Sequence, residues 1–226
     1  IRSLLFEGKN AEAQALMYER FLPRKEVSDA RYGTYQTLGA LDIDYVFPVN
    51  DGCGPDLQPV EYIRELIMDE GVARSSFIVD GIRYSKEFFA SRADDVMVLR
   101  LTSSEKGALS FKAVLSRQEN AAAGVEHKKC GRRKLHAATL EGSLESGIPG
   151  KKGISYKVAM TVASSDGKAV YSDGAITLTG ASEAILIISA ATSYSAEGTI
   201  FPGERYVSFC DSLLDAAARK NYNELS

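Results

Sequence analysis

The sequence predicts an all-β fold, an antiparallel β-sandwich with short helices at its N- and C-terminal ends. Three observations lead to this fold class: roughly ten short segments have strand-like patterns, turn residues separate them, and helical crossovers are missing between them. Because parallel strands need such crossovers, the strands are expected to pair antiparallel. The 226 residues and 45% hydrophobic composition suit one sandwich domain over residues 1–226.

The two ends of the chain have helical spacing. Apolar residues recur at that spacing over residues 1–22, with an interruption at Gly8, and the pattern stops before Pro23. We expect two short helices or one kinked helix there. Residues 207–222 have apolar side chains at helical spacing as well, which predicts a second helical region at the C-terminal end.

Between these ends, residues 35–194 are expected to form the sandwich. Leu41, Ile43 and Tyr45 alternate with aspartates, which predicts a half-buried strand. Asp80-Gly81 predicts a tight hairpin turn, because such turns require positive φ. Residues 95–102 are short and strongly apolar, which predicts a central strand buried on both faces. Further strands are expected at 62–68, 109–115, 135–141, 155–163, 169–171, 175–179 and 184–189, whereas residues 116–133 have no clear pattern.

Composition excludes several classes of partner. The net charge of -3 provides no field that would gather a polyanion, so we expect no nucleic acid partner. The longest apolar run, residues 184–191, is shorter than the roughly 18 residues of a membrane helix. The chain begins at Ile1 without a signal-peptide pattern, which is typical of a segment of a longer protein. Three cysteines, Cys53, Cys130 and Cys210, are expected to be free thiols.

Motifs that carry chemistry are scarce. The two histidines lie in a basic segment over residues 127–136, where His127, Cys130 and His136 are one conceivable zinc site. Their spacing fits no standard ligand pattern, so a solvated hairpin loop is the favoured interpretation. We expect no metal and no cofactor, because phosphate-binding glycine motifs are missing too.

Pairs of carboxylates are a further kind of candidate site, because glycoside hydrolysis uses two carboxyl groups. Each candidate pair is better explained by solvent-facing strand positions or by loops, and sequence provides no sign of the burial that tunes catalytic pKa values. We therefore predict no catalytic residue. The pairs are Asp42 with Asp44, Asp94 with Asp95, and Glu61 with Glu65.

Five motifs occur in the order found in a known family. They are IRSLLFEGKNAEA at 1–13, YQTLGAL at 35–41, YIREL at 62–66, VDGIRYSKEFFAS at 79–91 and AATSY at 190–194. Together they resemble the N-terminal β-sandwich of family 95 glycoside hydrolases, the α-L-fucosidases and α-L-galactosidase-like enzymes. The chain departs from the family pattern at Thr37, Ala40, Lys86 and Ala93.

The resemblance implies an antiparallel β-super-sandwich followed by a helical linker and an (α/α)6 barrel, with the catalytic acid in the barrel. The chain alone would then be inactive. Its partners would be its own C-terminal catalytic barrel and, through the full-length enzyme, fucosylated or related glycans. The helix at 207–222 would lead toward the linker. A periplasmic or secreted bacterial location is implied as well.

Four residues near the matched motifs are candidates for substrate-binding or barrel-facing contacts: Tyr35, Gln36, Thr192 and Tyr194. The competing interpretation places them as buried strand ends, which is common for aromatic and β-branched residues. Two rival functions are an autonomous carbohydrate-binding module and a complete metal-dependent enzyme. The chain has no tryptophan, the largest aromatic surface for a sugar face, which weakens the first rival.

Overall fold

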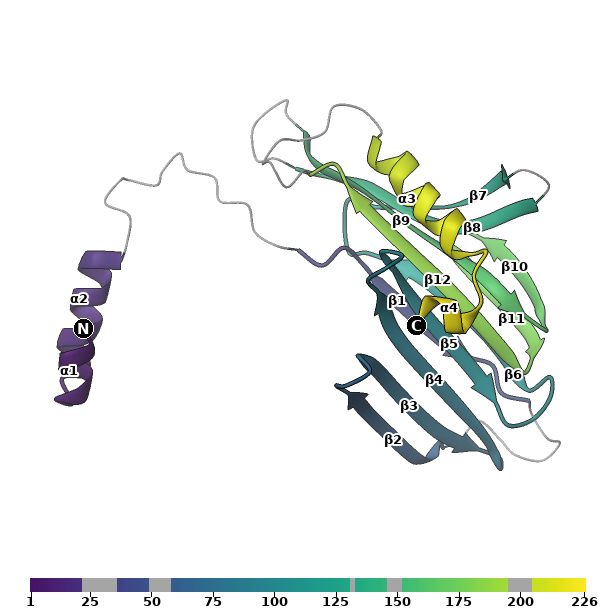
Figure 1. Cartoon of the computed structure of the whole chain (residues 1–226), viewed down its shortest axis with the longest axis horizontal. Coiled ribbons are helices and arrows are strands. Elements are labelled where there is room, and N and C mark those ends of the chain that lie inside the picture. Colours follow the sequence, from purple (N-terminus) through teal and green to yellow (C-terminus); the bar gives the residue numbers. More distant parts are fainter. Residues whose placement is uncertain (22–35, 49–57, 131–132, 146–151, 195–204) are drawn as a thin grey trace. The chain divides into compact units, whose positions relative to one another are not determined.

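The computed structural model describes residues 1–21, 36–48, 58–130, 133–145, 152–194 and 205–226 (Figure 1). The chain divides into two compact units, Ile1–Gln36 and Thr37–Ser226. The first unit contains two helices, α1 (Arg2–Phe6) and α2 (Asn10–Phe21), with Gly8 at φ +75° between them. A positive φ is readily adopted only by glycine, so Gly8 accounts for the interruption in the helical pattern.

The second unit is a β-sandwich, which confirms the predicted all-β class. A four-stranded sheet has the order β1-β6-β11-β10 and an eight-stranded sheet the order β2-β3-β4-β5-β12-β9-β8-β7. Neighbouring strands pair antiparallel throughout the described residues. The strands are β1 (Ala40–Tyr45), β2 (Val60–Ile67), β3 (Val72–Val79), β4 (Ile82–Ser91), β5 (Val96–Ser103), β6 (Leu109–Ser116), β7 (Ala122–Cys130), β8 (Arg133–Glu145), β9 (Lys152–Ser165), β10 (Lys168–Ser172), β11 (Ala175–Ala181) and β12 (Glu183–Thr192).

Local sequence signals account for the best-predicted elements. Asp80 and Gly81 have φ of 49° and 78°, as a tight turn between β3 and β4 requires. In β5, Val98 and Leu99 are 0% and 3% exposed although neighbouring strand residues point to opposite faces. The predicted central strand buried on both faces is therefore confirmed.

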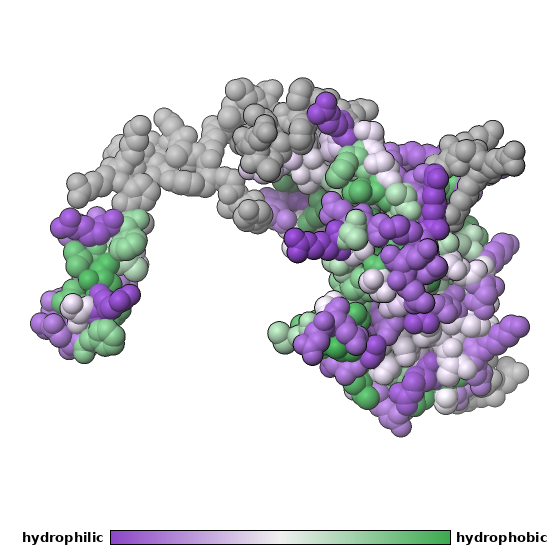
Figure 2. Space-filling view, viewed as in Figure 1, coloured by the Kyte–Doolittle hydropathy of each residue, from purple (hydrophilic) through white to green (hydrophobic). Residues whose placement is uncertain are grey.

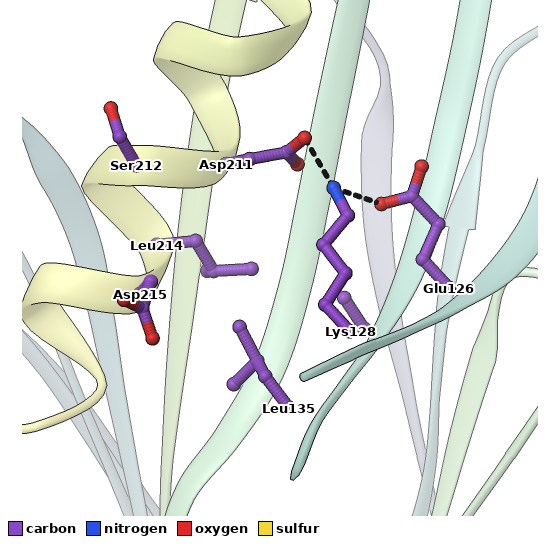
Figure 3. Close-up of a pocket in the computed structure, with 8 residues that line it drawn as sticks. Glu126, Lys128, Leu135, Asp211, Ser212, Leu214 and Asp215 are labelled. Atoms are coloured by element: carbon purple, nitrogen blue, oxygen red, sulfur yellow. Dashed lines mark ion pairs between the residues drawn. The ribbon is translucent and has the colours of Figure 1, made fainter. Parts of the chain in front are cut away.

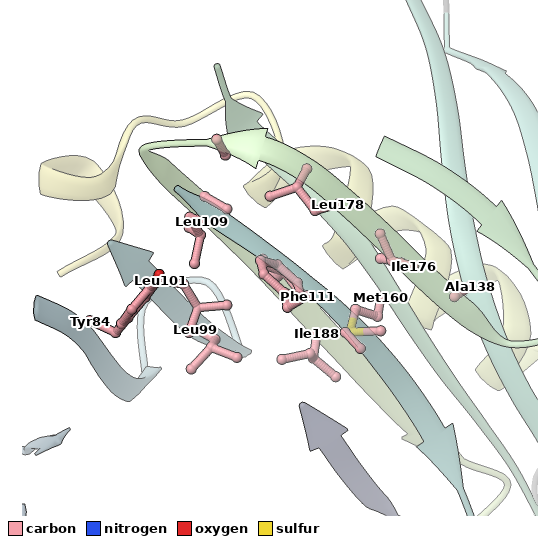
Figure 4. Packing of buried hydrophobic residues seen from close by; sticks show 14 of the residues in the cluster. Tyr84, Leu99, Leu101, Leu109, Phe111, Ala138, Met160, Ile176, Leu178 and Ile188 are labelled. Carbon is pink, nitrogen blue, oxygen red and sulfur yellow. The ribbon is translucent and has the colours of Figure 1, made fainter. Parts of the chain in front are cut away.

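Two hydrophobic cores lie on the two faces of the eight-stranded sheet. We call the face toward the four-stranded sheet the inner face and the other the outer face. Figure 4 shows the inner core, where Phe111, Met160 and Ile176 are fully buried between the sheets. On the outer face, α3 (Arg205–Ala217) and α4 (Tyr222–Leu225) form a third layer, and Leu214 of α3 packs into the second core (Figure 1).

Two sequence predictions need correction, and one segment without a prediction is now assigned. Residues 116–133, which have no clear pattern, contain the whole of β7, an edge strand whose Glu126 and Lys128 form ion pairs instead of an apolar stripe. The basic segment 127–136 lies largely on β7 and β8 instead of in a loop. The helix expected over 207–222 is divided into α3 and α4, because a new helix starts at Asn221, whose side chain caps it.

The remaining predictions concern cysteines and membrane spans. Cys210 is a free, buried thiol, whereas Cys53 and the side chain of Cys130 lie outside the described residues. None of the described helices has both the length and the apolar content to cross a membrane.

Candidate functional site

The four candidate contact residues do not form one described site. Tyr35 lies outside the described residues, and Gln36 is an exposed residue of the helical unit. Thr192 and Tyr194 belong to the sandwich unit, where the Tyr194 amide donates a 3.4 Å hydrogen bond to Thr192 Oγ1. Tyr194 is 52% exposed and Thr192 is exposed too, so these two are surface residues instead of buried strand ends.

In each candidate carboxylate pair, at least one member is bound by another side chain. Asp42 accepts a 3.3 Å hydrogen bond from Ser116 Oγ and lies, like Asp44, at an exposed position of β1. Glu61 pairs with Arg83 at 2.7 Å and Glu65 with Arg74 at 3.5 Å. Asp94 pairs with Lys220 and accepts a hydrogen bond from Ser91.

The two histidines are directly opposite each other on β7 and β8. Their Nδ1 atoms are 2.5 Å apart, and the His136 ring lies 5.8 Å from the ring of Tyr171. Within the described ranges, no group of three or more His, Cys, Asp or Glu side chains could hold a metal ion. The conceivable zinc site therefore gains no third ligand from that part of the chain.

The most buried charge in the described sandwich is Lys157 on β9, whose side chain is 0% exposed. Its Nζ lies 2.7 Å from Glu126 of β7, 3.3 Å from Glu141 of β8 and 3.0 Å from Asp211 of α3. Lys128 of β7 pairs with Glu126 and Asp211 as well. We call these five residues the Lys157 cluster. It joins three neighbouring strands to the helix that covers them.

A pocket of about 220 Å³ opens beside the Lys157 cluster, between α3 and the β7–β8 hairpin. Figure 3 shows Asp211 and Glu126 converging on the Lys128 ammonium from opposite sides, with Leu135 and Leu214 below them. Asp215 also lines the pocket and pairs with Arg219, four residues later and just past the end of α3. The carboxylates that line it are therefore each opposed by a cation.

The protonation states in the Lys157 cluster are fixed by these contacts. Burial opposes the charged form of Lys157, but hydrogen bonds to Glu126 and Asp211 outweigh burial and hold the pKa of Lys157 above its usual value. Burial likewise acts to raise the pKa of Glu126, and hydrogen bonds from Lys128 and Lys157 outweigh it, so that pKa is lowered. Both groups stay charged at neutral pH. Asp211 attaches α3 to the two lysines of the cluster. Groups that stay charged are poorly suited to move protons.

A second charge network covers the outer face of β2–β5. Arg74 Nη2 lies 2.9 Å from Glu87 Oε1, and Arg100 bonds both Glu87 and Glu183. The Tyr222 hydroxyl of α4 donates a 3.0 Å hydrogen bond to Glu87 Oε2. Burial would raise the pKa of Glu87, but bonds from Tyr222 and Arg74 outweigh it and lower that pKa. The network borders a pocket of about 460 Å³ and attaches α4 to the sheet.

Sequence reasoning missed both charge networks. The one available signal was Lys157 itself, a lysine between Tyr156 and Val158 in an otherwise apolar stretch of strand. Its partners are far away in the sequence, with Glu126 31 residues earlier. The identity of those partners depends on strand order, which the sequence pattern does not specify.

Comparisons with known proteins agree with this architecture. The family described as "Glycosyl hydrolase family 65, N-terminal domain" matches residues 1–197. The chain is 25% identical over 212 residues to "Alpha-L-fucosidase 2" of Arabidopsis thaliana, covering 88% of this chain and 24% of that protein. The solved structure of "Putative kojibiose phosphorylase from human microbiome" is similar with a TM-score of 0.50 and 9% identity, covering 81% of this chain and 26% of that one.

These findings confirm the prediction of an N-terminal glycoside hydrolase domain. The fucosidase relative agrees with the family 95 resemblance, while the family description that spans the chain carries the number 65. The structural likeness, at 9% identity, concerns the fold alone. The chain spans about a quarter of the length of both relatives. Because the family match spans residues 1–197 of 226, the chain belongs to the family of glycosyl hydrolase family 65 N-terminal domains.

Proposed function

We propose that this chain is the non-catalytic N-terminal domain of an inverting, α-L-fucosidase-like glycoside hydrolase. It packs against and supports an (α/α)6 catalytic barrel supplied by the rest of the enzyme. The family membership and the fucosidase relative, of which this chain covers 24%, support this proposal. Fucosylated or related glycans are then the substrates of the full-length enzyme.

One observation carries the non-catalytic role. An inverting glycosidase needs a general acid with a raised pKa and a second carboxylate roughly 6.5–9.5 Å away. The pKa values of Glu87, Glu126 and Asp166 are all lowered, which is the opposite of what the acid requires. Two of them are bound by basic side chains, and Asp166 accepts hydrogen bonds from the backbone amides of Ser182 and Glu183. These groups are proton-poor at neutral pH and unsuited to act as the acid.

The contact residues fit a supporting role. Thr192 ends strand β12 and Tyr194 lies just after it, and both are exposed, so they are available to a neighbouring domain or to substrate. In the full-length enzyme we expect Tyr194→Ala to lower kcat/KM by about tenfold through lost packing. Tyr18→Ala, on the 54% exposed tyrosine of α2, is a control of similar exposure. Equal effects of the two changes would remove Tyr194 from the proposal.

The test compares the 226-residue chain with the full-length enzyme on nitrophenyl α-L-fucoside. We expect turnover by the full-length enzyme alone, with β-L-fucose as the first product by proton NMR. Robust turnover by the chain itself would contradict its non-catalytic role. Hydrolysis of a different glycoside by the full-length enzyme would overturn the fucosidase specificity and leave the domain role intact.

A second candidate function is autonomous carbohydrate binding. It is favoured by Tyr62 and Tyr194, which are 61% and 52% exposed, because an exposed ring can stack on the C–H face of a pyranose. Binding of the 226-residue chain to a glycan array, lost in both Tyr62→Ala and Tyr194→Ala, would support this candidate. Silence across the array would count against it.

A further inference from the structure

The two sheets of the sandwich differ in width, and one part of the wider sheet has no described partner. The eight-stranded sheet begins with β2-β3-β4, whereas the four-stranded sheet opposite ends at β1. Tyr45 and Phe47, at and beyond the end of β1, pack edge-on against Phe77 and Tyr84 of β3 and β4. These rings mark the boundary of the four-stranded sheet. Beyond them lies the remaining inner face of β2–β4.

That face is apolar and exposed. Register places Leu66, Ala73, Phe88 and Leu99 in one row across β2–β5, on the inner face. Leu99 is 3% exposed within the core, but Phe88 is 37% and Leu66 is 66% exposed, and Met68, just beyond β2, is 83% exposed. Along this row, the side chains change from buried in the core at β5 to exposed at β2, although all of them lie on the same face of one sheet. Fully burying a side chain such as leucine contributes about 1.5–3 kcal/mol, so this surface is suited to a packed neighbour.

The charges on the same face lack partners. Arg64 and Lys86 form the next row with Ser75, and neither makes an ion pair with the described residues. On the outer face of the same strands, Glu65, Arg74, Glu87 and Arg100 are all paired. The inner face thus presents two cations beside an apolar row, which suits a neighbour that is apolar and carries acidic side chains.

The free edge of β1 adjoins this face. Among the described residues, β1 pairs with β6 alone. The Val46 amide bonds Ser110 O, and antiparallel pairs alternate, so the backbone N–H and C=O groups of Leu41, Ile43 and Tyr45 point to the free edge. The Tyr45 hydroxyl is also buried without a hydrogen-bond partner in the described part, and burial raises its pKa. An unpaired edge and a buried polar atom both call for a neighbour.

We propose that a β-strand from outside residues 1–226 of the same enzyme pairs with the free edge of β1 and covers the inner face of β2–β4. Its inward side chains pack on Leu66 and Phe88, and acidic residues on it pair with Arg64 and Lys86. The four-stranded sheet thereby gains the strand that continues its packing over the wider sheet.

A strand fits better than a helix or a separate domain. Only a strand satisfies the edge groups of β1 while extending an existing sheet layer over the exposed row. The relatives are about three to four times as long as this chain, so most of such an enzyme lies outside these residues. The covered face would be continuous with the inter-sheet core, which already packs sheet against sheet.

The test uses cysteine labelling in the full-length enzyme. Leu66→Cys places a thiol on the inner face, and Ile63→Cys is the matched control, since Ile63 pairs with Ser76 on the outer face of the same strand and is 54% exposed. With maleimide and peptide-resolved mass spectrometry, we expect Leu66→Cys to react at least about tenfold more slowly than Ile63→Cys. Equal rates would overturn the proposal.

Amide hydrogen exchange on the unmodified enzyme identifies the occupant. We expect slow exchange at Leu41, Ile43 and Tyr45 in the full-length enzyme and fast exchange at the same amides in the 226-residue chain. A protected Leu66→Cys with rapidly exchanging β1 amides would mean that another domain covers the face, and the strand proposal would be wrong. Protection of both within the 226-residue chain would assign the face to a segment of this chain, which is also contrary to the proposal. Neither readout depends on catalysis, so the result is separate from the proposed function.

Discussion

The two faces of strands β2–β4 differ in how far their side chains have partners within the described residues. On the outer face, the second charge network joins Glu65, Arg74, Glu87 and Arg100 by ion pairs, and it holds α4 through Tyr222. On the inner face, Leu66 remains 66% exposed. Figure 2 shows hydrophilic residues over much of the visible surface of the sandwich unit. On the outer face, the charged side chains of these strands are therefore paired and contact α4. On the inner face, an apolar side chain is available to a packed neighbour.

The opposite end of the sheet completes the comparison. There the Lys157 cluster connects β7, β8 and β9 to α3. Every charge of that cluster has a partner inside the chain, although Lys157 is fully buried. Ion pairs therefore hold both ends of the outer layer. Among the described residues, the exposed apolar row and the buried Tyr45 hydroxyl without a partner lie where the four-stranded sheet stops.

The largest effect is expected where a buried charge is removed. Lys157→Ala leaves Glu126, Glu141 and Asp211 without their shared cation, and breaking a buried ion pair costs about 3–5 kcal/mol. We expect the free energy of unfolding in urea to fall by that amount. Lys112→Ala, at an exposed position of β6, is the control and should change it by less than about 0.5 kcal/mol. A loss below about 1 kcal/mol for Lys157→Ala, as expected for a surface ion pair, would contradict the idea that the Lys157 cluster holds α3 on the sheet.

The next effect concerns the apolar side of the same attachment. Leu214 of α3 is 1% exposed in the outer core, so Leu214→Ala should cost about 2–5 kcal/mol by leaving a cavity. Phe209→Ala, on the same helix and 50% exposed, should cost far less. Thermal unfolding of the two variants measures the difference. Similar losses would mean that α3 is not packed as described.

The sequence predicts the strands better than the charges because strand signals are local. Asp80-Gly81 and the alternation of Leu41, Ile43 and Tyr45 are each read within a few residues, and the structure agrees with both. Strand β7 was missed because its helix-facing side chains are ions, not apolar residues.

The partners of Lys157 could not be predicted for a different reason. Glu126 and Asp211 approach it only through sheet order and helix docking, which no short-range pattern encodes. The exposure of Thr192 and Tyr194 corrected the buried alternative, but their roles as contacts stay predictions. The roles of Tyr35 and Gln36 stay predictions as well.

A moderate effect is expected on the outer face. Glu87→Gln weakens the bonds from Arg74 and Tyr222 while keeping the size of the side chain, and it should cost about 1–2 kcal/mol. Glu119→Gln, an exposed change outside the network, is the control. Urea unfolding at neutral pH compares them. If the two variants were equally stable, the second charge network would contribute nothing measurable to the free energy of unfolding.

The change in stability with pH should be smaller than the effect of Glu87→Gln at neutral pH. It tests the same second charge network. The pKa values of Glu87 and Glu126 are lower in the folded chain than their usual values. Their contribution is therefore fully present above the unfolded-state pKa and is lost as pH falls through the lowered folded values, below about pH 4. We expect the difference between the wild-type chain and Glu87→Gln to shrink from pH 7 to pH 3. A constant difference would mean that the Glu87 carboxylate is not stabilised by its charge partners.

The smallest effect is expected at the open face, and it decides whether the comparison holds. Leu66 and Leu99 belong to one row of the same sheet, but Leu99 is 3% exposed and Leu66 is 66% exposed. In the 226-residue chain, Leu99→Ala should cost about 2–5 kcal/mol, whereas Leu66→Ala should cost less than about 0.5 kcal/mol. Urea unfolding of both variants measures the ratio directly. A loss above about 1.5 kcal/mol for Leu66→Ala would require apolar packing on this face from within the chain, because an exposed leucine has no such packing to lose.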